Sequence, residues 1–454
     1  MILYRYRSIQ TALDELDNGT FYFASRDELN DPIEGYIHIY WQGDCAAFEG
    51  LLKNYICSLF YNTQKYLLKI TAYYETPLEK MLTEIENHAV LIDTRRFKNT
   101  LTEEIFNIIG KIFLAHENIC NVAKFYGDRN IKCSAREMEF ILRTVTDTAF
   151  QICIKRCKEL RLIEKNFNER YFDIEYNFPL EEFQNLDDDT RLIKIHDLEN
   201  SICDMMESGL FNLKSAPKKS ANKNDSYELK QNFLWMRLCY PKMYVKKLQS
   251  MLYPAGYVIC FSTTATNSAM WGNYADNHKG ICFIYETQQD TISIDGSDFE
   301  IKPIIYSKNV IERNFFETLK NLDFADAEVW LTGKNNLSSK ILDNPPVDEN
   351  FYKKDYHDKF FIKMPEWQHE NEYRVLLADK FQKYANPTNR RFKYDLNSLK
   401  GVVFGIRTTV REKLELIQKL RRLYKSLDDF EFWQAEYDDK SKNISIRRQS
   451  LFVR

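Results

Sequence analysis

Two glutamates and an arginine stand together near the C-terminal third of the chain, at the start of a predicted strand. Glu370, Glu372 and Arg374 occupy alternate positions of WQHENEYRVL at residues 367–376. Side chains at alternate positions of a strand point to the same face. An arginine beside a carboxylate orients it and favours its ionised form. The spacing indicates a carboxylate that can act on a bound ligand, with a surface ion pair as the simpler alternative.

Two arginines alternate in the first strand-like run, ILYRYR at residues 2–7. The spacing predicts that Arg5 and Arg7 lie on the same strand face. Guanidinium forks suit a phosphate or pyrophosphate group, so this strand is a candidate for anion binding. Two exposed arginines on an edge strand would give the same pattern.

An aromatic and polar stretch connects two further predicted strands, Val258–Phe261 and Ile281–Tyr285. The connection is longer than a hairpin turn requires, so we expect it to present side chains to a ligand. Trp271 and Tyr274 offer flat faces for a base or a nicotinamide ring, and His278 offers a nitrogen that titrates near neutral pH. The alternatives are aromatic rings packed over a sheet and a structural histidine.

The segment FASRDELNDPIEG at residues 23–35 follows the predicted strand Thr20–Ala24. Asn30 and Asp31 precede a proline, and this combination is typical of a turn. Asp31 and Glu34 are therefore either structural caps or acids at the edge of a site.

The composition excludes several classes of protein. A net charge of -3 excludes an overall basic character, so nucleic acid would need a local patch. The 10 cysteines include no pair at the spacing of a zinc knuckle, so we expect reduced thiols and no metal site. The N-terminus lacks the apolar segment of a signal peptide, and no apolar run reaches the ~18 residues of a membrane helix. We expect a cytoplasmic protein that does not bind membranes.

The order of the predicted elements indicates an α+β fold, with a mixed sheet core interrupted by a large all-helical insertion. We expect residues 1–44 and 251–454 to form one sheet-centred domain that carries the site, and residues 45–250 to form the helical subdomain. Ser134 with Glu137 and Thr409 with Glu412 predict helix-capping boxes. The lysine-rich segment Ser215–Ser226 is predicted to be the first site of proteolysis.

Four runs carry a resemblance to a known family: LYRYR at 3–7, FASRDELNDPIEG at 23–35, MWGNYADNHKG at 270–280 and WQHENEYRVL at 367–376. As a set, in this order, they resemble a bacterial and phage family catalogued as domain of unknown function twenty-nine seventy-one. The resemblance covers about residues 1–40 and 255–410. It implies a fold core and a site, but no reaction.

The order of an early arginine strand, a serine, an aromatic loop and a late strand-borne glutamate is also similar to ADP-ribosyltransferases. In that family Arg, Ser or Tyr, and Glu bind and cleave NAD. The resemblance implies that Arg5 holds phosphate, that Ser25 helps to place the substrate, and that Glu372 stabilises the oxocarbenium-like ribose or orients its hydroxyl. Glu370 takes the position two residues before the catalytic glutamate, whereas a Ser-Thr-Ser second strand is absent.

Three hypotheses follow. The first is an NAD-consuming transferase or glycohydrolase, acting as a toxic effector in antiphage defence, with NAD as the small-molecule nucleotide substrate and a protein or nucleic acid as the target. The second is a metal-dependent nuclease in which Asp31, Glu34, Glu370 and Glu372 gather magnesium; the absence of a lysine near Glu372 speaks against it. The third is a non-catalytic module that binds a nucleotide or peptide. For the first we predict one pocket containing catalytic Glu372, Glu370 and His278 and, as binding residues, Arg5, Arg7, Ser25, Asn30, Asp31, Trp271, Tyr274 and Arg374.

Overall fold

The computed structural model describes residues 1–31, 34–72, 85, 89–90, 100–163, 178–215, 227–288, 290–321, 324–379 and 382–449. The chain forms two compact units, one of Met1–Ile37, Pro254–Ile311 and Lys353–Arg454, and one of His38–Tyr253 and Glu312–Tyr352. The predicted sheet-centred domain included residues 38–44, 251–253 and 312–352, which the structure groups with the helical unit. Whether the units fold as separate domains stays a prediction. Residues 216–226 of the predicted proteolysis site lie outside the described residues, as do Pro32 and Ile33.

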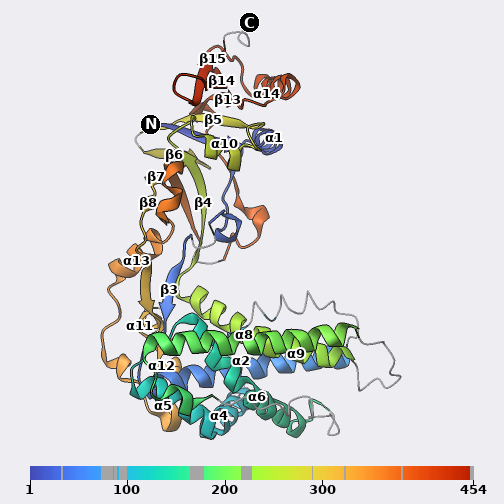
Figure 1. Cartoon of the computed structure of the whole chain (residues 1–454), viewed down its shortest axis with the longest axis vertical. Coiled ribbons are helices and arrows are strands. Elements are labelled where there is room, and N and C mark those ends of the chain that lie inside the picture. Colours follow the sequence, from blue (N-terminus) through green and yellow to red (C-terminus); the bar gives the residue numbers. More distant parts are fainter. Residues whose placement is uncertain are drawn as a thin grey trace. The chain divides into compact units, whose positions relative to one another are not determined.

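A mixed sheet forms the framework of the first unit (Figure 1). Within the described residues it has nine strands, in the order β15 (Asn443–Arg448), β14 (Glu431–Asp438), β13 (Leu399–Phe404), β5 (Ile281–Glu286), β1 (Ile2–Arg7), β4 (Ala255–Ser262), β11 (Glu372–Asp379), β7 (Ser297–Pro303) and β6 (Thr291–Ile294). β13 and β14 run parallel, and the adjoining pairs are antiparallel. The predicted α+β class with a mixed sheet is confirmed.

Other short strands of the described residues form three two-stranded sheets. β2 (Thr20–Tyr22) pairs with β12 (Arg391–Lys393), and β8 (Ile305–Tyr306) pairs in parallel with β10 (Ile362–Lys363). β3 (Ile37–Tyr40) pairs with β9 (Ile311–Asn314). The 3-10 helix η6 (Pro365–Glu370) follows β10 and leads directly to β11.

The N-terminal strand β1 is central in the sheet, because it lies between β4 and β5. It pairs with β5 from Ile2↔Glu286 to Arg7↔Ile281. The two strands predicted on either side of the aromatic stretch are therefore separated by β1 in the sheet. The connection is also more regular than its sequence suggested, since it contains helix α10 (Ser268–Tyr274), capped by the side chain of Asn267.

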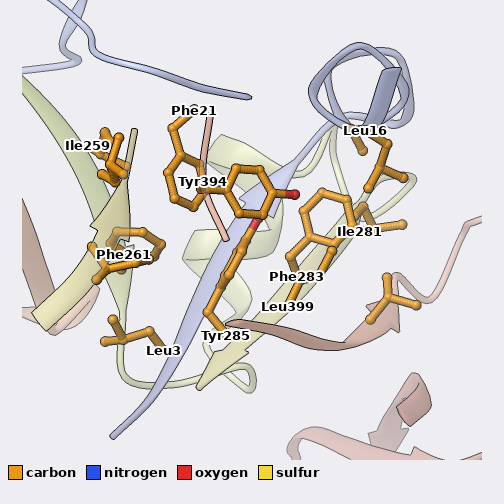
Figure 2. Packing of buried hydrophobic residues seen from close by; sticks show 14 of the residues in the cluster. Leu3, Leu16, Phe21, Ile259, Phe261, Ile281, Phe283, Tyr285, Tyr394 and Leu399 are labelled. Carbon is orange, nitrogen blue, oxygen red and sulfur yellow. The ribbon is translucent and has the colours of Figure 1, made fainter. Parts of the chain in front are cut away.

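The main core packs aromatic and branched side chains against one face of the sheet. Figure 2 shows Leu3 of β1 with Phe283 and Tyr285 of β5, and the ring of Phe21 beside that of Tyr394. The last two rings are stacked, with centroids 4.1 Å apart. Helices α1 (Ile9–Asn18) and α14 (Val410–Leu423) contribute Leu16 and Leu420, among others, to this core. Such burial stabilises the sheet by roughly 25 cal/mol per Å² of apolar surface removed from water.

The second unit consists mainly of long helices, as predicted. They are α2 (Cys45–Ala72), α4 (Thr100–Ala115), α5 (Glu117–Asp128), α6 (Ala135–Glu159), α8 (Asp188–Ser215) and α9 (Tyr227–Leu252), with the shorter α7 (Leu180–Phe183), α11 (Phe315–Leu319) and α12 (Phe324–Trp330). The capping boxes of Ser134 with Glu137 and of Thr409 with Glu412 are both present. Between α6 and α8, Arg143 Nε lies 3.2 Å from Glu199 Oε1, and Arg191 Nε lies 3.0 Å from Glu137 Oε1.

Within the described residues, no helix is both long enough and apolar enough to cross a membrane.

Candidate active site

A cavity of about 250 Å³ lies in the first unit, at the point where strands β1 and β4 diverge. In the described residues these two strands pair only at Tyr4↔Ser262. Further along β4, Val258 exchanges two backbone hydrogen bonds of 2.9 Å with Ala24 instead. The space between the strands is lined by Tyr4 to Arg7, Tyr22, Ala24, Glu28 to Asn30, Glu34, Val258 to Ser262, Met270, Tyr274, Lys363, Glu370, Glu372 and Arg374.

A buried cluster of carboxylates surrounds one lysine at this cavity. Lys363 of β10 donates from Nζ to Glu370 Oε2 at 2.6 Å and to Glu372 Oε2 at 3.0 Å. Its ammonium also lies 3.4 Å from Glu34 Oε2. All four side chains are at most 5% exposed. Burial of so many charges is favourable only when they are paired, and here one cation serves three anions.

Arg374, two residues after Glu372 in β11, completes the cluster. Its Nε donates to Glu372 Oε1 at 2.6 Å, and its Nη2 donates to Glu372 Oε2 at 2.9 Å. Nη2 also forms an ion pair with Glu34, and Nη1 donates to the carbonyl oxygen of Phe360 at 2.8 Å. This two-point contact fixes the plane of the Glu372 carboxylate, which confirms the predicted contact between these two residues.

The local backbone explains how Glu370 and Glu372 reach the same lysine. Glu370 ends η6, Glu372 begins β11, and Asn371 between them has a φ of 45°. Asparagine adopts this left-handed conformation more readily than most residues. The turn at Asn371 therefore joins the helix to the strand in one residue and brings both carboxylates to Lys363.

Glu370 has a second partner in the aromatic stretch. Tyr274 donates from its hydroxyl to Glu370 Oε1 at 2.6 Å. Tyr274 is the last residue of α10, and Asn267, which caps that helix, donates from Nδ2 to the carbonyl oxygen of His369 at 2.6 Å. The stretch 267–274 is thus attached to η6 at two points, and it places a tyrosine ring on the cavity wall.

Burial and charge shift several pKa values at the site. Burial raises the pKa of Glu372 to about 7, while the Lys363 ammonium opposes that rise. Burial raises the pKa of the Tyr274 hydroxyl, and the Glu370 carboxylate adds to this effect. Burial lowers the pKa of Arg374 to about 9. Burial also disfavours the charge of Lys363, but the carboxylates of Glu372 and Glu370 raise its pKa overall. Shifts of this kind, at a cavity, are typical of functional carboxylates.

The structure brings Tyr274, Glu370, Glu372, Arg374 and Asn30 to the cavity, together with Arg5 and Arg7. The strand-borne residues of this group project from two opposite faces of the sheet. Tyr4 of β1, Ser262 of β4 and Glu372 of β11 are paired across three adjacent strands, so their side chains share one face. Arg5 follows Tyr4 in the strand, so its side chain points to the opposite face.

On that opposite face Arg5 and Arg7 share a buried carboxylate, that of Glu15 in α1. Arg5 Nη2 lies 3.2 Å from Glu15 Oε1, and Arg7 Nε donates to the same oxygen at 2.8 Å. The Arg5 guanidinium also lies over the rings of Phe21 and Phe261, at 4.8 and 5.6 Å from their centroids. The predicted shared face of the two arginines is confirmed, whereas a phosphate-binding role for Arg5 stays a prediction.

Four predicted residues do not line the cavity. Trp271 is fully buried, packs edge-on against Tyr6 and donates from Nε1 to the carbonyl oxygen of Ala265 at 2.8 Å. His278 lies in a turn of left-handed residues and has a φ of 69°. Ser25 caps the 3-10 helix η1 (Arg26–Glu28) through Glu28, and Asp31 is buried beside the cluster. The expected convergence of Trp271 and His278 with the carboxylates is therefore wrong.

Other site residues were missed or misjudged. The statement that no lysine stands near Glu372 is wrong, because Lys363 contacts it directly. The serine beside Glu372 is Ser262, which is followed by two threonines, rather than Ser25. Ser262 Oγ donates to the carbonyl oxygen of Glu370 at 2.7 Å. A serine at the end of a predicted strand was visible in the sequence, but only the strand order shows that it adjoins Glu372.

A metal centre has no direct geometric support. Within the described ranges, the structure holds no group of three or more His, Cys, Asp or Glu side chains arranged to bind a metal ion. The cluster of Glu34, Glu370 and Glu372 instead has the Lys363 ammonium among its carboxylates.

Comparison with known proteins gives a family but no activity. No curated protein and no solved structure matches the chain. Residues 270–375 match the family described as "Protein of unknown function (DUF2971)", and this range includes Tyr274, Lys363, Glu370, Glu372 and Arg374. The resemblance predicted from the sequence is confirmed over these residues, and the chain carries a DUF2971 family domain there.

Proposed function

We propose that the protein consumes NAD, cleaving the bond between nicotinamide and ribose and transferring ADP-ribose to water or to an acceptor. The observation that carries the proposal is the placement of Glu372, a 5% exposed carboxylate on a cavity wall that is oriented by Arg374 and Lys363. A second carboxylate, Glu370, stands two residues away on the same lysine. Paired carboxylates at a cavity suit the cleavage of a glycosidic bond through a cationic transition state.

In the proposed reaction, the C1′–N1 bond of NAD breaks and its electron pair goes to the pyridinium nitrogen, which releases neutral nicotinamide. The positive charge that develops on the ribose is stabilised by the Glu372 carboxylate. The oxygen of water, or a nucleophile of an acceptor, then bonds to C1′ and loses one proton. The products are nicotinamide, ADP-ribose in free or attached form, and a proton, and no redox partner is needed.

The remaining walls of the cavity are compatible with this substrate class. Tyr4, Tyr22 and Tyr274 are half-buried tyrosines on the wall, and such rings pack against flat heterocycles while their hydroxyls bind polar groups. Ser262 and Asn30 add short polar side chains. A few polar groups among apolar walls are typical of small-molecule sites.

The test is nicotinamide release from NAD by the purified full chain. Wild-type protein should release it, and Glu372→Gln should abolish the release because the amide carries no negative charge. The matched control is Glu436→Gln, which removes an exposed glutamate paired with Arg447. Activity lost in the Glu372 variant and kept in the Glu436 variant would support the proposal.

A metal-dependent nuclease is the second candidate, and the position of Lys363 favours it. The presence of this lysine beside Glu370 and Glu372 removes the objection raised from the sequence. Magnesium would have to enter among Glu34, Glu370 and Glu372, where the ammonium now lies. Cleavage of RNA or DNA that requires magnesium, without nicotinamide release, would establish this function instead. Binding of a nucleotide without any turnover would indicate a non-catalytic module.

A role as a toxic effector in antiphage defence rests on the proposed chemistry. NAD consumption inside a cell would deplete a central cofactor, and growth should stop when the wild-type chain is expressed. Glu372→Gln expressed at the same level should leave both growth and cellular NAD unchanged.

A further inference from the structure

The buried cluster at Glu372 has an unbalanced charge. Glu34, Glu370 and Glu372 bring three carboxylates, while Lys363 and Arg374 bring two cations, and all five side chains are at most 5% exposed. Lys363 is the only cation in the described contacts that touches all three carboxylates. Arg374 touches two of them, Glu372 and Glu34.

We propose that Lys363 and Glu34 are positioning residues that set, in opposite directions, the ionisation of the Glu372 carboxylate. Lys363 donates to both Glu370 and Glu372, and its charge favours the ionised form of Glu372. Glu34 competes with Glu372 for both cations and adds a like charge to the cluster. The inference rests on the proposed function for its kinetic test, and neither residue needs to touch the substrate for it to hold.

The groups that face Glu372 come from several elements. The charged ones are Lys363 of β10, Glu370 of η6 and Arg374 of β11, and Glu34 shares both of these cations with Glu372. Asp31 acts on the charge of Arg374. The neutral ones are Tyr274 bound to Glu370, the Tyr306 hydroxyl that accepts from the Glu372 backbone amide at 2.8 Å, and the thiol of Cys260 on β4. Burial raises the pKa of Tyr306 to about 12 and raises the pKa of Cys260, so both stay neutral at physiological pH.

The direction of each effect follows from the charges. Removal of the Lys363 ammonium leaves three carboxylates with one cation, which favours the protonated form of Glu372. Removal of the Glu34 charge leaves two carboxylates with two cations, which favours the ionised form. A charge at this distance in a buried site shifts a carboxyl pKa by about one unit or more.

The experiment measures the pH profile of nicotinamide release by the full chain for wild type, Lys363→Met, Lys363→Arg and Glu34→Gln. If only ionised Glu372 is active, the acidic limb of kcat reports its ionisation in the complex with substrate. We expect the midpoint of this limb to move upward by about one pH unit in Lys363→Met and downward by about one unit in Glu34→Gln. Lys363→Arg keeps the charge and should restore the midpoint to within a few tenths of a unit of wild type.

The matched control is Lys320→Met. Lys320 is another buried lysine, 4% exposed, which donates to the carbonyl oxygens of Ile341, Asn344 and Pro345 at 2.8, 2.9 and 3.1 Å. Its loss should lower the melting temperature without moving the pH profile. If Lys363 had a purely structural role, Lys363→Met would also lower the melting temperature and leave the pH profile in place. A profile that moves in Lys363→Met but not in Lys320→Met therefore distinguishes a positioning role from a structural one.

Failure of the inference and failure of the proposed function give different results. Wild-type protein that releases no nicotinamide at any pH contradicts the proposed function. The ionisation of Glu372 can then still be read from its carboxyl stretching band, as the difference between infrared spectra of wild type and Glu372→Gln in each background. Two results would overturn the inference in either assay. The first is a Glu372 ionisation midpoint that is the same in Glu34→Gln and wild type. The second is a midpoint that moves in the same direction in Glu34→Gln and Lys363→Met. If Lys363→Met does not fold, Glu34→Gln and Lys363→Arg decide it.

Discussion

Arg374 binds the carboxylate of Glu372 through two hydrogen bonds. Nε donates to Oε1 at 2.6 Å, and Nη2 donates to Oε2 at 2.9 Å. Both side chains are on β11, two residues apart, so the strand itself sets their spacing. Because Arg374 also binds Glu34 and the carbonyl oxygen of Phe360, the carboxylate of Glu372 has one defined orientation at the cavity.

Replacement of Arg374 by methionine should therefore affect both stability and activity. It leaves Glu372 and Glu34 with Lys363 as their shared cation, and loss of one partner of a buried ion pair costs about 3–5 kcal/mol. Urea denaturation measures this change. Arg374→Lys keeps the charge but loses the two-point contact, so it should recover part of the stability while kcat stays at least about 10-fold below wild type. Full activity in Arg374→Lys would show that the orientation of Glu372 is unimportant.

The raised pKa of Glu372 predicts two opposite effects of pH. Activity should increase as pH rises through about 7, where the carboxyl loses its proton. The same group should make folding less favourable over this range. Its pKa in the folded state is above the ordinary value of 4.5, so its contribution to stability is present below about 4.5 and is lost as pH rises to about 7. The free energy of unfolding of Glu372→Gln should lack this decline, and identical pH dependence in both proteins would contradict the assignment.

Trp271 should behave as a core residue. It is fully buried and hydrogen-bonded to Ala265, so Trp271→Ala should lower the free energy of unfolding by about 3–5 kcal/mol. Thermal melting compared with Trp433→Ala, a half-buried tryptophan of β14, measures the difference. A melting temperature near that of wild type would return Trp271 to the list of ligand-binding candidates.

His278 should be dispensable for the chemistry. It does not line the cavity, and burial together with Arg407 lowers the pKa of its ring. Its φ of 69° favours a residue that tolerates the left-handed region, so His278→Asn is the appropriate substitution. The variant should keep kcat and KM of nicotinamide release within about two-fold of wild type, since it alters a surface turn. A large fall in kcat would place the histidine in the reaction.

The sequence predicted those parts of the site that depend on short-range spacing. Glu372 and Arg374 alternate along β11, and alternation alone determines their common face. Glu370 was predicted on the same strand but ends η6, and it reaches the same lysine through the left-handed turn at Asn371. Trp271 was misjudged because α10 has only seven residues, too few to show a helical period, so a buried aromatic ring resembled an exposed one.

Lys363 and Ser262 could not be placed in the same way. Lys363 lies in a two-residue strand within a charged and irregular region, and nothing in its neighbourhood distinguishes it from a surface lysine. The insertion of β1 between β4 and β5 is a long-range pairing, and it is this pairing that creates the cavity beside Ser262. Patterns within one segment carry no information about which distant strands become neighbours.

The most direct test of the central claim is the rate of nicotinamide release from NAD by wild type and by Glu372→Gln, measured in parallel at pH 8. At this pH the Glu372 carboxyl, with its pKa of about 7, is largely ionised. The account predicts steady release by the wild type and a loss of at least about 100-fold in the variant, with both proteins folded by circular dichroism. Equal rates in the two proteins, or no release by a folded wild type, would contradict it.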